Sequence, residues 1–284
     1  MKILISLFLS VITVSFLYAE PLTLEQAQNV LEKDNMETGI DVHFGYYSWT
    51  VAEVANTEYV RKELVVPLFI KYGIDEKTEL KCIIPFKVLS GSTTGLDDNK
   101  VNGLGAIVIG AKYNFVEDSD EAPAVAMAIN LDLPTGNPKK VLRESGSLGE
   151  GFNWEGLGII TKSISKVINL TVNIGYKGKS KYTNTNDAKV TPGGILEYGA
   201  EIEYKSASEF TILCEAYGTK YNDFKIDENV QSGTGGRTFD IIPGIRLKTG
   251  SLKTKLGVAI PVGPVTNQTY NFKVIGGISY LFQI

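Results

Sequence analysis

Alternating apolar and polar residues recur along this chain from about Gly39 to its last residue. In the stretch 125–133, large apolar side chains occupy every second position, namely Val125, Met127, Ile129, Leu131 and Leu133. The same period of two returns in 170–177 and in 272–284. Because successive side chains of a β-strand point to opposite faces, the pattern predicts strands.

Twelve segments of this kind are predicted, and connections of alternating length separate them. The predicted strands are 39–50, 59–72, 77–89, 105–116, 123–133, 157–167, 169–177, 195–205, 209–219, 237–248, 252–262 and 271–284. The 157–167 segment has the weakest pattern, because Lys162 and Lys166 share a face with Ile160 and Ile164.

The connections fall into two classes. Those at 73–76, 117–122, 168, 206–208 and 249–251 are short, whereas those at 90–104, 134–156, 178–194 and 220–236 are long and polar. The loops at 51–58 and 263–270 are intermediate and lie on the long-loop side. An even strand count with this alternation predicts an all-β, transmembrane, antiparallel up-and-down β-barrel with short periplasmic turns and long extracellular loops.

Aromatic residues gather at the ends of the predicted strands. Seven adjoin short turns (Tyr72, Tyr113, Phe115, Tyr204, Phe210, Tyr280 and Phe282), and five mark the opposite ends (Trp49, Phe86, Tyr176, Phe239 and Phe272). Two such belts are typical of the two membrane–water interfaces, while a soluble β-sandwich would place aromatic residues nearer strand centres. The belts favour the barrel.

The amino terminus has the pattern of an export signal. Lys2 precedes an apolar stretch at 3–17, and Ala19 stands before the expected cleavage site, although Leu17 is less usual at its position. The alternative is an uncleaved anchor, but this stretch is shorter than the roughly 20 residues that a spanning helix needs. We therefore predict a signal peptide at 1–19, a periplasmic lead-in or plug at 20–38, and a barrel at 39–284. Within the second segment, 21–35 is predicted to be helical.

Composition narrows the range of partners. The net charge is −4 and the isoelectric point is about 5.3, which argues against nucleic acid as a partner. The two cysteines, Cys82 and Cys214, fall on outward faces of strands far apart in the sequence. In a closed barrel, the Cα atoms of residues on such strands are farther apart than the ~7 Å limit for a disulfide. Both thiols are therefore predicted to be free and to face lipid.

If the apolar positions face lipid, the other face of each strand lines the lumen. The lumen-lining candidates are Asp41, His43, Arg61, Glu63, Lys81, Lys112, Asp132, Glu197, Glu201, Glu215, Asp240, Arg246, Lys255 and Lys273. Opposite charges facing each other would create a transverse field that orients polar solutes. The same groups would close the lumen if they paired directly, and pairing is the safer assumption because unpaired buried charges are costly.

Motifs of catalysis and cofactor binding do not account for the chain. His43 is its one histidine, and no G-x-S-x-G segment accompanies it. No C-x-x-C or H-E-x-x-H spacing occurs, and the acidic groups at 97–99 and 223–229 lack the spacing of a calcium loop. We therefore predict no enzymatic activity, no metal and no cofactor.

Two groups of motifs resemble a known family. One is the run from Val66 to Leu80, which begins Val-Pro-Leu-Phe-Ile-Lys-Tyr-Gly. The other comprises Gly103-Leu104-Gly105, Gly110-Ala111-Lys112-Tyr113 and Leu133-Pro134-Thr135-Gly136. From about Val60 onward, the chain resembles the outer-membrane proteins grouped as the "MetA-pathway of phenol degradation" transporter family.

The resemblance implies an outer-membrane barrel that takes up small, hydrophobic or aromatic compounds; it supplies no set of substrate-binding residues. One departure is the ending, where Gln283 and Ile284 follow Phe282 instead of a terminal aromatic residue. The expected partners are outer-membrane lipid, a small solute and the barrel-assembly machinery. The competing hypothesis is a closed structural barrel whose long loops bind external partners.

Overall fold

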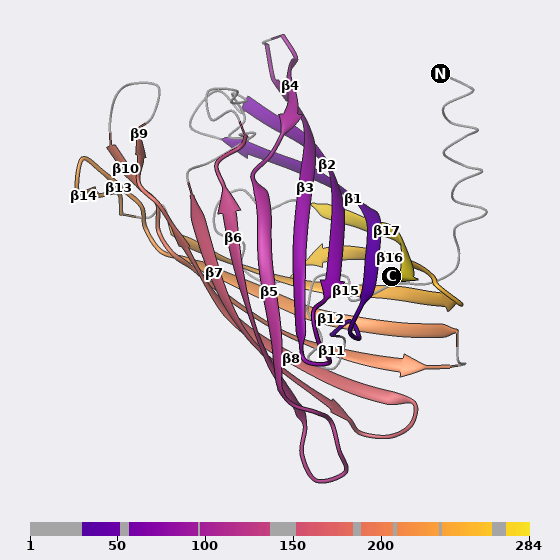
Figure 1. Cartoon of the computed structure of the whole chain (residues 1–284). Helices are drawn as coiled ribbons and strands as arrows, with labels where there is room; N and C mark the ends of the chain where they lie inside the picture. Colours follow the sequence, from indigo (N-terminus) through magenta and orange to yellow (C-terminus); the bar gives the residue numbers. More distant parts are fainter. Residues whose placement is uncertain are drawn as a thin grey trace.

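The computed structural model describes residues 30–51, 57–95, 97–136, 152–183, 189–206, 209–232, 235–262 and 271–284, and within them the chain is all-β (Figure 1). The long strands are β1 (Asn35–Val51), β2 (Thr57–Gly73), β3 (Thr78–Thr93), β5 (Ile107–Val116), β6 (Ala124–Leu133), β7 (Asn153–Ser163), β8 (Ile168–Lys179), β11 (Ile195–Lys205), β12 (Phe210–Tyr221), β15 (Gly236–Thr249), β16 (Leu252–Pro261) and β17 (Phe272–Gln283). The short strand β4 (Asn99–Leu104) precedes β5. Within the described residues no helix is long and apolar enough to cross a membrane.

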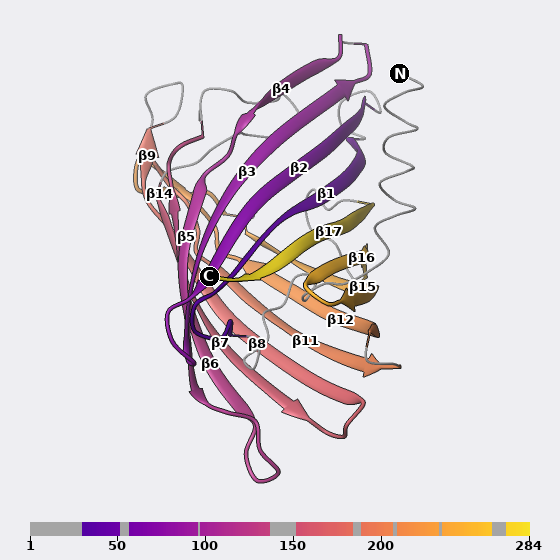
Figure 2. The same cartoon turned by 45° about the vertical axis from the view of Figure 1, so that its right-hand side comes forward.

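The long strands form one closed antiparallel barrel. Each strand pairs with its neighbour in sequence, and β1 also pairs with β17, which closes the wall (Figures 1 and 2). Strands β4 and β5 share a single place in the wall, because both pair with β3. The wall therefore has the twelve strands and the meander order that the sequence predicts.

The two faces of the wall differ in exposure and composition. On β6, buried alanines at 124, 126 and 128 alternate with Met127 and Ile129, which are about half exposed. Leu68, Ile174 and Ile202 likewise point outward, with 52%, 59% and 53% of their surface exposed. Large apolar side chains displayed all round a closed barrel suit contact with hydrocarbon. The inner face, in contrast, carries buried polar and charged side chains.

Aromatic side chains stand at both ends of the outer surface. Near the short turns, the Tyr113 and Phe115 rings pack edge to face with centroids 4.9 Å apart, and Tyr280 lies 4.9 Å from Phe282. At the opposite end, the rings of Trp154 and Tyr176 are 5.8 Å apart. Trp154 lies in β7, although the sequence pattern predicted that it belongs to the loop 134–156. The arrangement matches two interfacial belts.

The largest boundary error concerns the sixth predicted strand. The expected range was 157–167, but β7 covers Asn153–Ser163, and residues 164–167 form the turn to β8. The turn is fixed by hydrogen bonds from the backbone N–H of Ile164 and of Ser165 to the Ile168 carbonyl. Lys162 does not break the strand, because its ammonium bonds carbonyls of the preceding short turn and lies 3.5 Å from Asp118.

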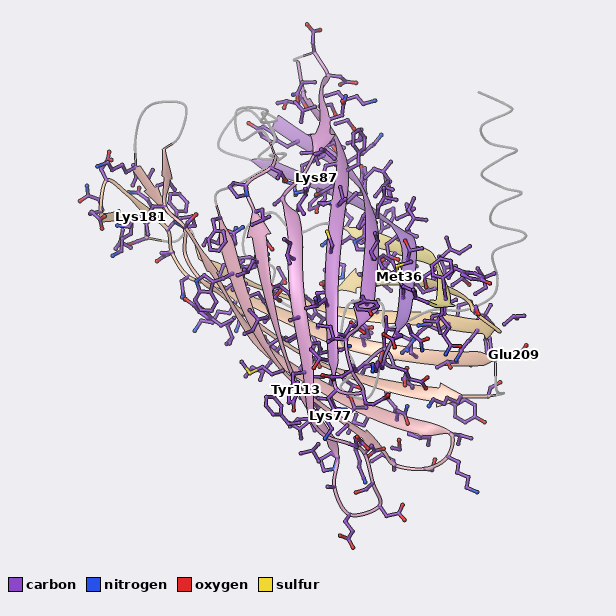
Figure 3. All side chains as sticks on the ribbon, in the orientation of Figure 1. Met36, Lys77, Lys87, Tyr113, Lys181 and Glu209 are labelled. Carbon is purple, nitrogen blue, oxygen red and sulfur yellow. The ribbon has the colours of Figure 1, made fainter. Side chains whose placement is uncertain are left out.

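Strands also extend into predicted loops. β3 continues to Thr93, and β4 lies within the predicted loop 90–104. The loops at 178–194 and 220–236 supply β9 (Tyr182–Thr183), β10 (Lys189–Thr191), β13 (Lys225–Ile226) and β14 (Asn229–Val230), which form a separate four-stranded sheet. Figure 3 shows Lys181 beside this sheet, away from Lys77 and Glu209 in the short turns.

The start of the barrel differs slightly from expectation. β1 begins at Asn35, four residues before the predicted boundary, and residues 30–34 are not helical. The predicted signal peptide at 1–19 lies outside the described residues, as does most of the predicted helix at 21–35. Cys82 and Cys214 are both free thiols, as predicted.

Candidate functional site: the barrel lumen

The lumen-lining candidates all follow the inward phase of their strands. Lys112, Asp132, Glu201, Glu215, Asp240 and Arg246 are buried. Asp41, His43, Arg61, Glu63, Lys81, Glu197, Lys255 and Lys273 are half-buried. Their strands alternate these positions with outward apolar residues, so the two faces are set by the period of two.

Near the short turns, the inner face is a tightly packed polar layer. The Arg246 guanidinium lies 2.9 Å from a Glu201 carboxylate oxygen and also bonds Glu203. The Asn169 amide donates to Glu203 at 3.0 Å. All four side chains are at least 94% buried. Two buried carboxylates therefore share one cation and a neutral donor, which reduces the cost of burying their charge.

A second group of pairs spans β17. The Lys253 ammonium donates to Glu37 at 2.6 Å, and Lys255 donates to Asp41 at 2.8 Å. Both lysines are on β16 and both acids on β1, so each pair reaches across the strand between them. Glu37, which fell in the predicted lead-in, is fully buried and also accepts a bond from the Ser279 hydroxyl at 2.5 Å.

The other lumen pairs also run along the wall. Lys112 and Glu79, which are register partners on neighbouring strands, are 3.7 Å apart. Lys177 on β8 reaches over β7 to Asp132 on β6 at 2.6 Å. These pairs neutralise charge locally within the wall. These groups pair directly, as the sequence allowed; the transverse field stays a prediction.

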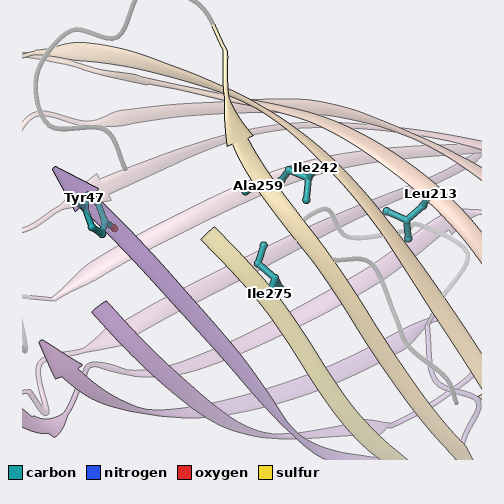
Figure 4. Close-up of a cluster of buried hydrophobic side chains, with 5 residues drawn as sticks. All are labelled: Tyr47, Leu213, Ile242, Ala259 and Ile275. Carbon is teal, nitrogen blue, oxygen red and sulfur yellow. The ribbon is translucent and has the colours of Figure 1, made fainter. Parts of the chain in front are cut away.

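The inner wall carries an apolar band, from Leu213 near the short turns to Tyr47 nearer the long loops, that the predicted polar lumen lacks. It consists of Tyr47, Leu213, Ile242, Ala259 and Ile275, each at most 6% exposed (Figure 4). These residues come from the contiguous strands β1, β17, β16, β15 and β12. The sequence signal was present in apolar runs such as 258–260 and 274–275, where a purely polar inner face would break the run.

Toward the long-loop end, Tyr47 joins this band to a polar group. Its hydroxyl donates to Glu63 at 3.0 Å, and the Arg61 guanidinium stacks over its ring at 3.8 Å. Arg61 and Glu63 lie 4.0 Å apart. A guanidinium stacked on an aromatic face provides a flat surface in the lumen.

The short-turn end of the lumen is contacted by the residues that precede β1. The backbone N–H of Leu31 donates to the Glu79 carboxylate at 3.1 Å, and the Leu31 side chain is buried. The carbonyl groups of Leu31 and Glu32 sit so close to Gly73 on β2 that a side chain there would overlap them. Residues 31 and 32 therefore lie against β2 and β3 at the short-turn end of the barrel, which we call the inner mouth.

The described residues around His43 do not form an arrangement of reacting groups. Asp41, the acid expected beside His43, is engaged by Lys255. Among the residues that the structure describes, no three His, Cys, Asp or Glu side chains are grouped to hold a metal ion. The described lumen side chains are paired charges, amides, hydroxyls and apolar groups, which are typical of a lining.

Comparisons with known proteins support the fold. No family model matches the sequence, and no curated protein matches it. Among solved structures, the chain resembles an outer-membrane channel from Pseudomonas putida F1 with a TM-score of 0.75 and 12% identity, covering 93% of this chain and 100% of that one. It also resembles the transport unit of the autotransporter AIDA-I from Escherichia coli (TM-score 0.52, 13% identity, 98% and 97% covered). The chain therefore has the fold of outer-membrane β-barrels.

Proposed function

We propose that this protein resides in the outer membrane and lets small molecules pass through its lumen. The support is the combination of a closed barrel, an apolar outer band with aromatic rims, and an inner face of mixed chemistry. The fold it shares with an outer-membrane channel agrees with this function. The predicted signal at 1–19 would direct its export, and insertion would use the barrel-assembly machinery.

The solute we propose is small and hydrophobic or aromatic. The apolar band of Tyr47, Leu213, Ile242, Ala259 and Ile275 supports this proposal, because it replaces charged groups with apolar packing on the inner wall. The pairs Lys112–Glu79, Lys177–Asp132, Lys253–Glu37 and Lys255–Asp41 each match one positive with one negative charge along the wall, so these groups offer little net field to attract an ion. Membership of the phenol-degradation transporter family, which the sequence motifs suggested, would fit the same solute class.

The inner mouth is the proposed point of control. Passage requires the residues just before β1, which contact Glu79 and Gly73 at this mouth, to move aside. The bond from Leu31 to Glu79 favours a plug role for the segment that precedes β1 over a passive lead-in. The competing function is a closed barrel that only binds external partners. The buried polar layer around Arg246 favours that function.

The solute class is tested by making the apolar band polar. Ile275→Thr adds a hydroxyl to the inner face, and Val274→Thr makes the same change at the next, outward position. With vesicles that carry lipopolysaccharide in their outer leaflet, we expect Ile275→Thr to lower the ratio of phenol to L-arabinose flux several-fold. We expect Val274→Thr to leave this ratio unchanged. An unaltered ratio in Ile275→Thr would contradict the proposed solute class.

A further inference from the structure

Two lysines and a serine form a row on the outer face of the barrel near its long-loop end. Lys62 on β2 is the register partner of Ser90 on β3, and Ser90 is also the partner of Lys100 on β4. The row shares its face with the exposed Phe86 and Leu104, which lie an even number of positions away on β3 and β4. Both lysines are exposed, and the serine between them is half-buried.

The spacing of the row suits one anion held above the serine. Because neighbouring strands lie about 4.8 Å apart, the backbones of Lys62 and Lys100, with one strand between them, are separated by roughly 10 Å. Two long, flexible lysine side chains can converge across that distance. The Ser90 hydroxyl lies between them and can donate a further hydrogen bond. A phosphate group, with several charged acceptor oxygens, matches two ammonium groups and a hydroxyl.

Neither lysine of the row is engaged by a described acid. Within the part of the chain that the structure describes, the side chains of Lys62 and Lys100 make no hydrogen bond or ion pair. The Glu58 carboxylate, four residues before Lys62, accepts from the Ser48 hydroxyl at 3.3 Å. Beside the separate four-stranded sheet, in contrast, Lys181 lies 2.7 Å from Glu228. The row therefore presents two positive charges that a ligand can neutralise.

The row lies at the height of the outer aromatic belt. Tyr46 on β1 is the register partner of Lys62, and its ring stacks on Phe272 with centroids 5.9 Å apart. Such belts mark the level of the lipid headgroups. Toward the membrane centre, the same face continues with the exposed apolar side chains of Phe86 and Leu104. A ligand bound here would have its charged group at the row and apolar surface below it, which favours a lipid.

A second pair of cations has the same setting elsewhere on the wall. Lys220 on β12 and Arg237 on β15 are direct register partners, and both are exposed. Like charges that face each other across two strands repel, and neither side chain makes a hydrogen bond or ion pair with a described residue. Phe239 follows Arg237 on the same face, toward the membrane centre, and is 38% exposed. An anion between the two cations would offset their repulsion.

We propose that the outer rim of the barrel binds lipopolysaccharide, the phosphorylated glycolipid of the outer leaflet, at two sites. Lys62, Ser90 and Lys100 hold a phosphate group of one molecule, and Lys220 and Arg237 hold a phosphate group of another. Three strands, β16, β17 and β1, separate the two sites. The proposal uses only the residence in the outer membrane, which is the first part of the proposed function, and does not depend on passage through the lumen.

Native mass spectrometry of the full chain in detergent micelles counts the bound lipid. The probe is diphosphoryl lipid A, with EDTA present so that divalent cations do not bridge it to carboxylates. The variants are Lys62→Gln with Lys100→Gln, and Lys220→Gln with Arg237→Gln. The matched control is Lys166→Gln with Lys205→Gln, which removes two exposed lysines beside the short turns. Heat-modifiable migration on a gel checks that each barrel is folded.

We expect the parent chain and the control to retain two molecules of lipid A at saturation, and each rim variant to retain one. Equal retention by the parent and both rim variants, or an equal loss in the control, would overturn the two sites. Loss of solute flux in the parent with lipid A still bound would remove the proposed passage and leave these sites standing.

Two further probes separate the phosphate group from the rest of the lipid. We expect dephosphorylated lipid A to bind the parent about ten-fold more weakly than the diphosphoryl form, because the charge-assisted bonds are lost. Equal binding of the two forms would overturn the phosphate contacts. We expect inorganic phosphate at the same concentration to leave lipid A bound, and its displacement would show a site for free phosphate instead of a lipid.

A serine variant tests the first site without a change of charge. Ser90→Ala removes the hydroxyl between the two lysines, whereas Ser92→Ala removes the next hydroxyl on the same face of β3. We expect Ser90→Ala to weaken lipid A binding at this site about three-fold, the effect of one hydrogen bond. Ser92→Ala should leave the affinity unchanged. Equal affinities in the two variants would contradict a phosphate held over Ser90.

Discussion

Inward-facing Gly277 lies on β17 between the two partners of the Asp41–Lys255 ion pair. A Cβ at this position would overlap the Asp41 carboxylate and the end of Lys255. The lysine can therefore cross β17 only because the intervening residue has no side chain. The adjacent Gly276 faces outward, and a Cβ there would have ordinary contacts, the nearest at 3.6 Å from the Lys255 carbonyl.

We expect Gly277→Ala to destabilise the barrel by about 1–3 kcal/mol, because the added methyl group displaces the ion pair. Gly276→Ala adds the same methyl group on the lipid side and should change stability by less than about 0.5 kcal/mol. Urea unfolding in detergent micelles, followed by tryptophan fluorescence, measures both. Similar losses in the two variants would mean that the space around Gly277 is not specific to the pair.

Arg246 is the cation of the buried layer at the inner mouth. We expect Arg246→Met to cost about 3–5 kcal/mol, since it removes the positive charge that Glu201 and Glu203 share while both carboxylates stay buried. Adding Glu201→Gln and Glu203→Gln should recover most of that loss. Lys248→Met, two positions along the same strand face but exposed, is the control. A triple variant no more stable than Arg246→Met would contradict the charge-pairing account.

At the scale of elements, the short turn between β2 and β3 is held by Asp75. Its carboxylate accepts from the Lys77 backbone N–H at 2.8 Å and from the Thr78 hydroxyl at 3.1 Å. These bonds, the Lys77 backbone bond first, hold the pKa of Asp75 below its ordinary value. The charged form therefore stabilises the turn above the ordinary pKa, and this contribution is lost as the pH falls through the lowered pKa.

We expect Asp75→Asn to unfold at lower urea concentration than the parent chain at pH 7. The difference should shrink as the pH falls below about 4. Glu76→Gln removes an equal charge from the same turn and serves as the control. A gap between Asp75→Asn and the parent that stays constant from pH 7 to pH 2 would show that the carboxylate charge does not hold the turn.

Strands were predictable from the sequence wherever one face meets lipid, because every second residue of such a strand is apolar. It predicted β11 at its observed ends, Ile195–Lys205. It could not locate β9, β10, β13 and β14, which are two or three residues long and too short to show a period. The break between β4 and β5 was also hidden, because the residues that contact Gly105 there, Pro85 and Thr135, are distant from it in the sequence.

Lumen residues were predictable as a face but not as contacts. The period of two identifies which side chains point inward, whereas Lys253–Glu37 and Arg246–Glu201 join strands that are not neighbours in the sheet. Which residues form such pairs is determined by the register of the barrel strands and by the length of the side chains. The apolar band went unpredicted because its members point inward as apolar residues do in a soluble core, against the polar-lumen rule for barrels.

The whole molecule is a closed barrel in which lysine–carboxylate pairs run along the lumen wall. At its inner mouth, Leu31 bonds Glu79, and the carbonyl groups of residues 31 and 32 pack against Gly73. We propose that opening occurs there.

Single-channel conductance in planar bilayers would show whether molecules pass through the lumen. The full chain without residues 1–19 would be compared with a chain that begins at Asn35 and therefore lacks the Leu31–Glu79 contact. We expect brief, small conductance for the first and steady conductance for the second. Silence from both, with each barrel shown to be folded, would contradict passage through the lumen and favour a closed barrel that binds partners through its loops.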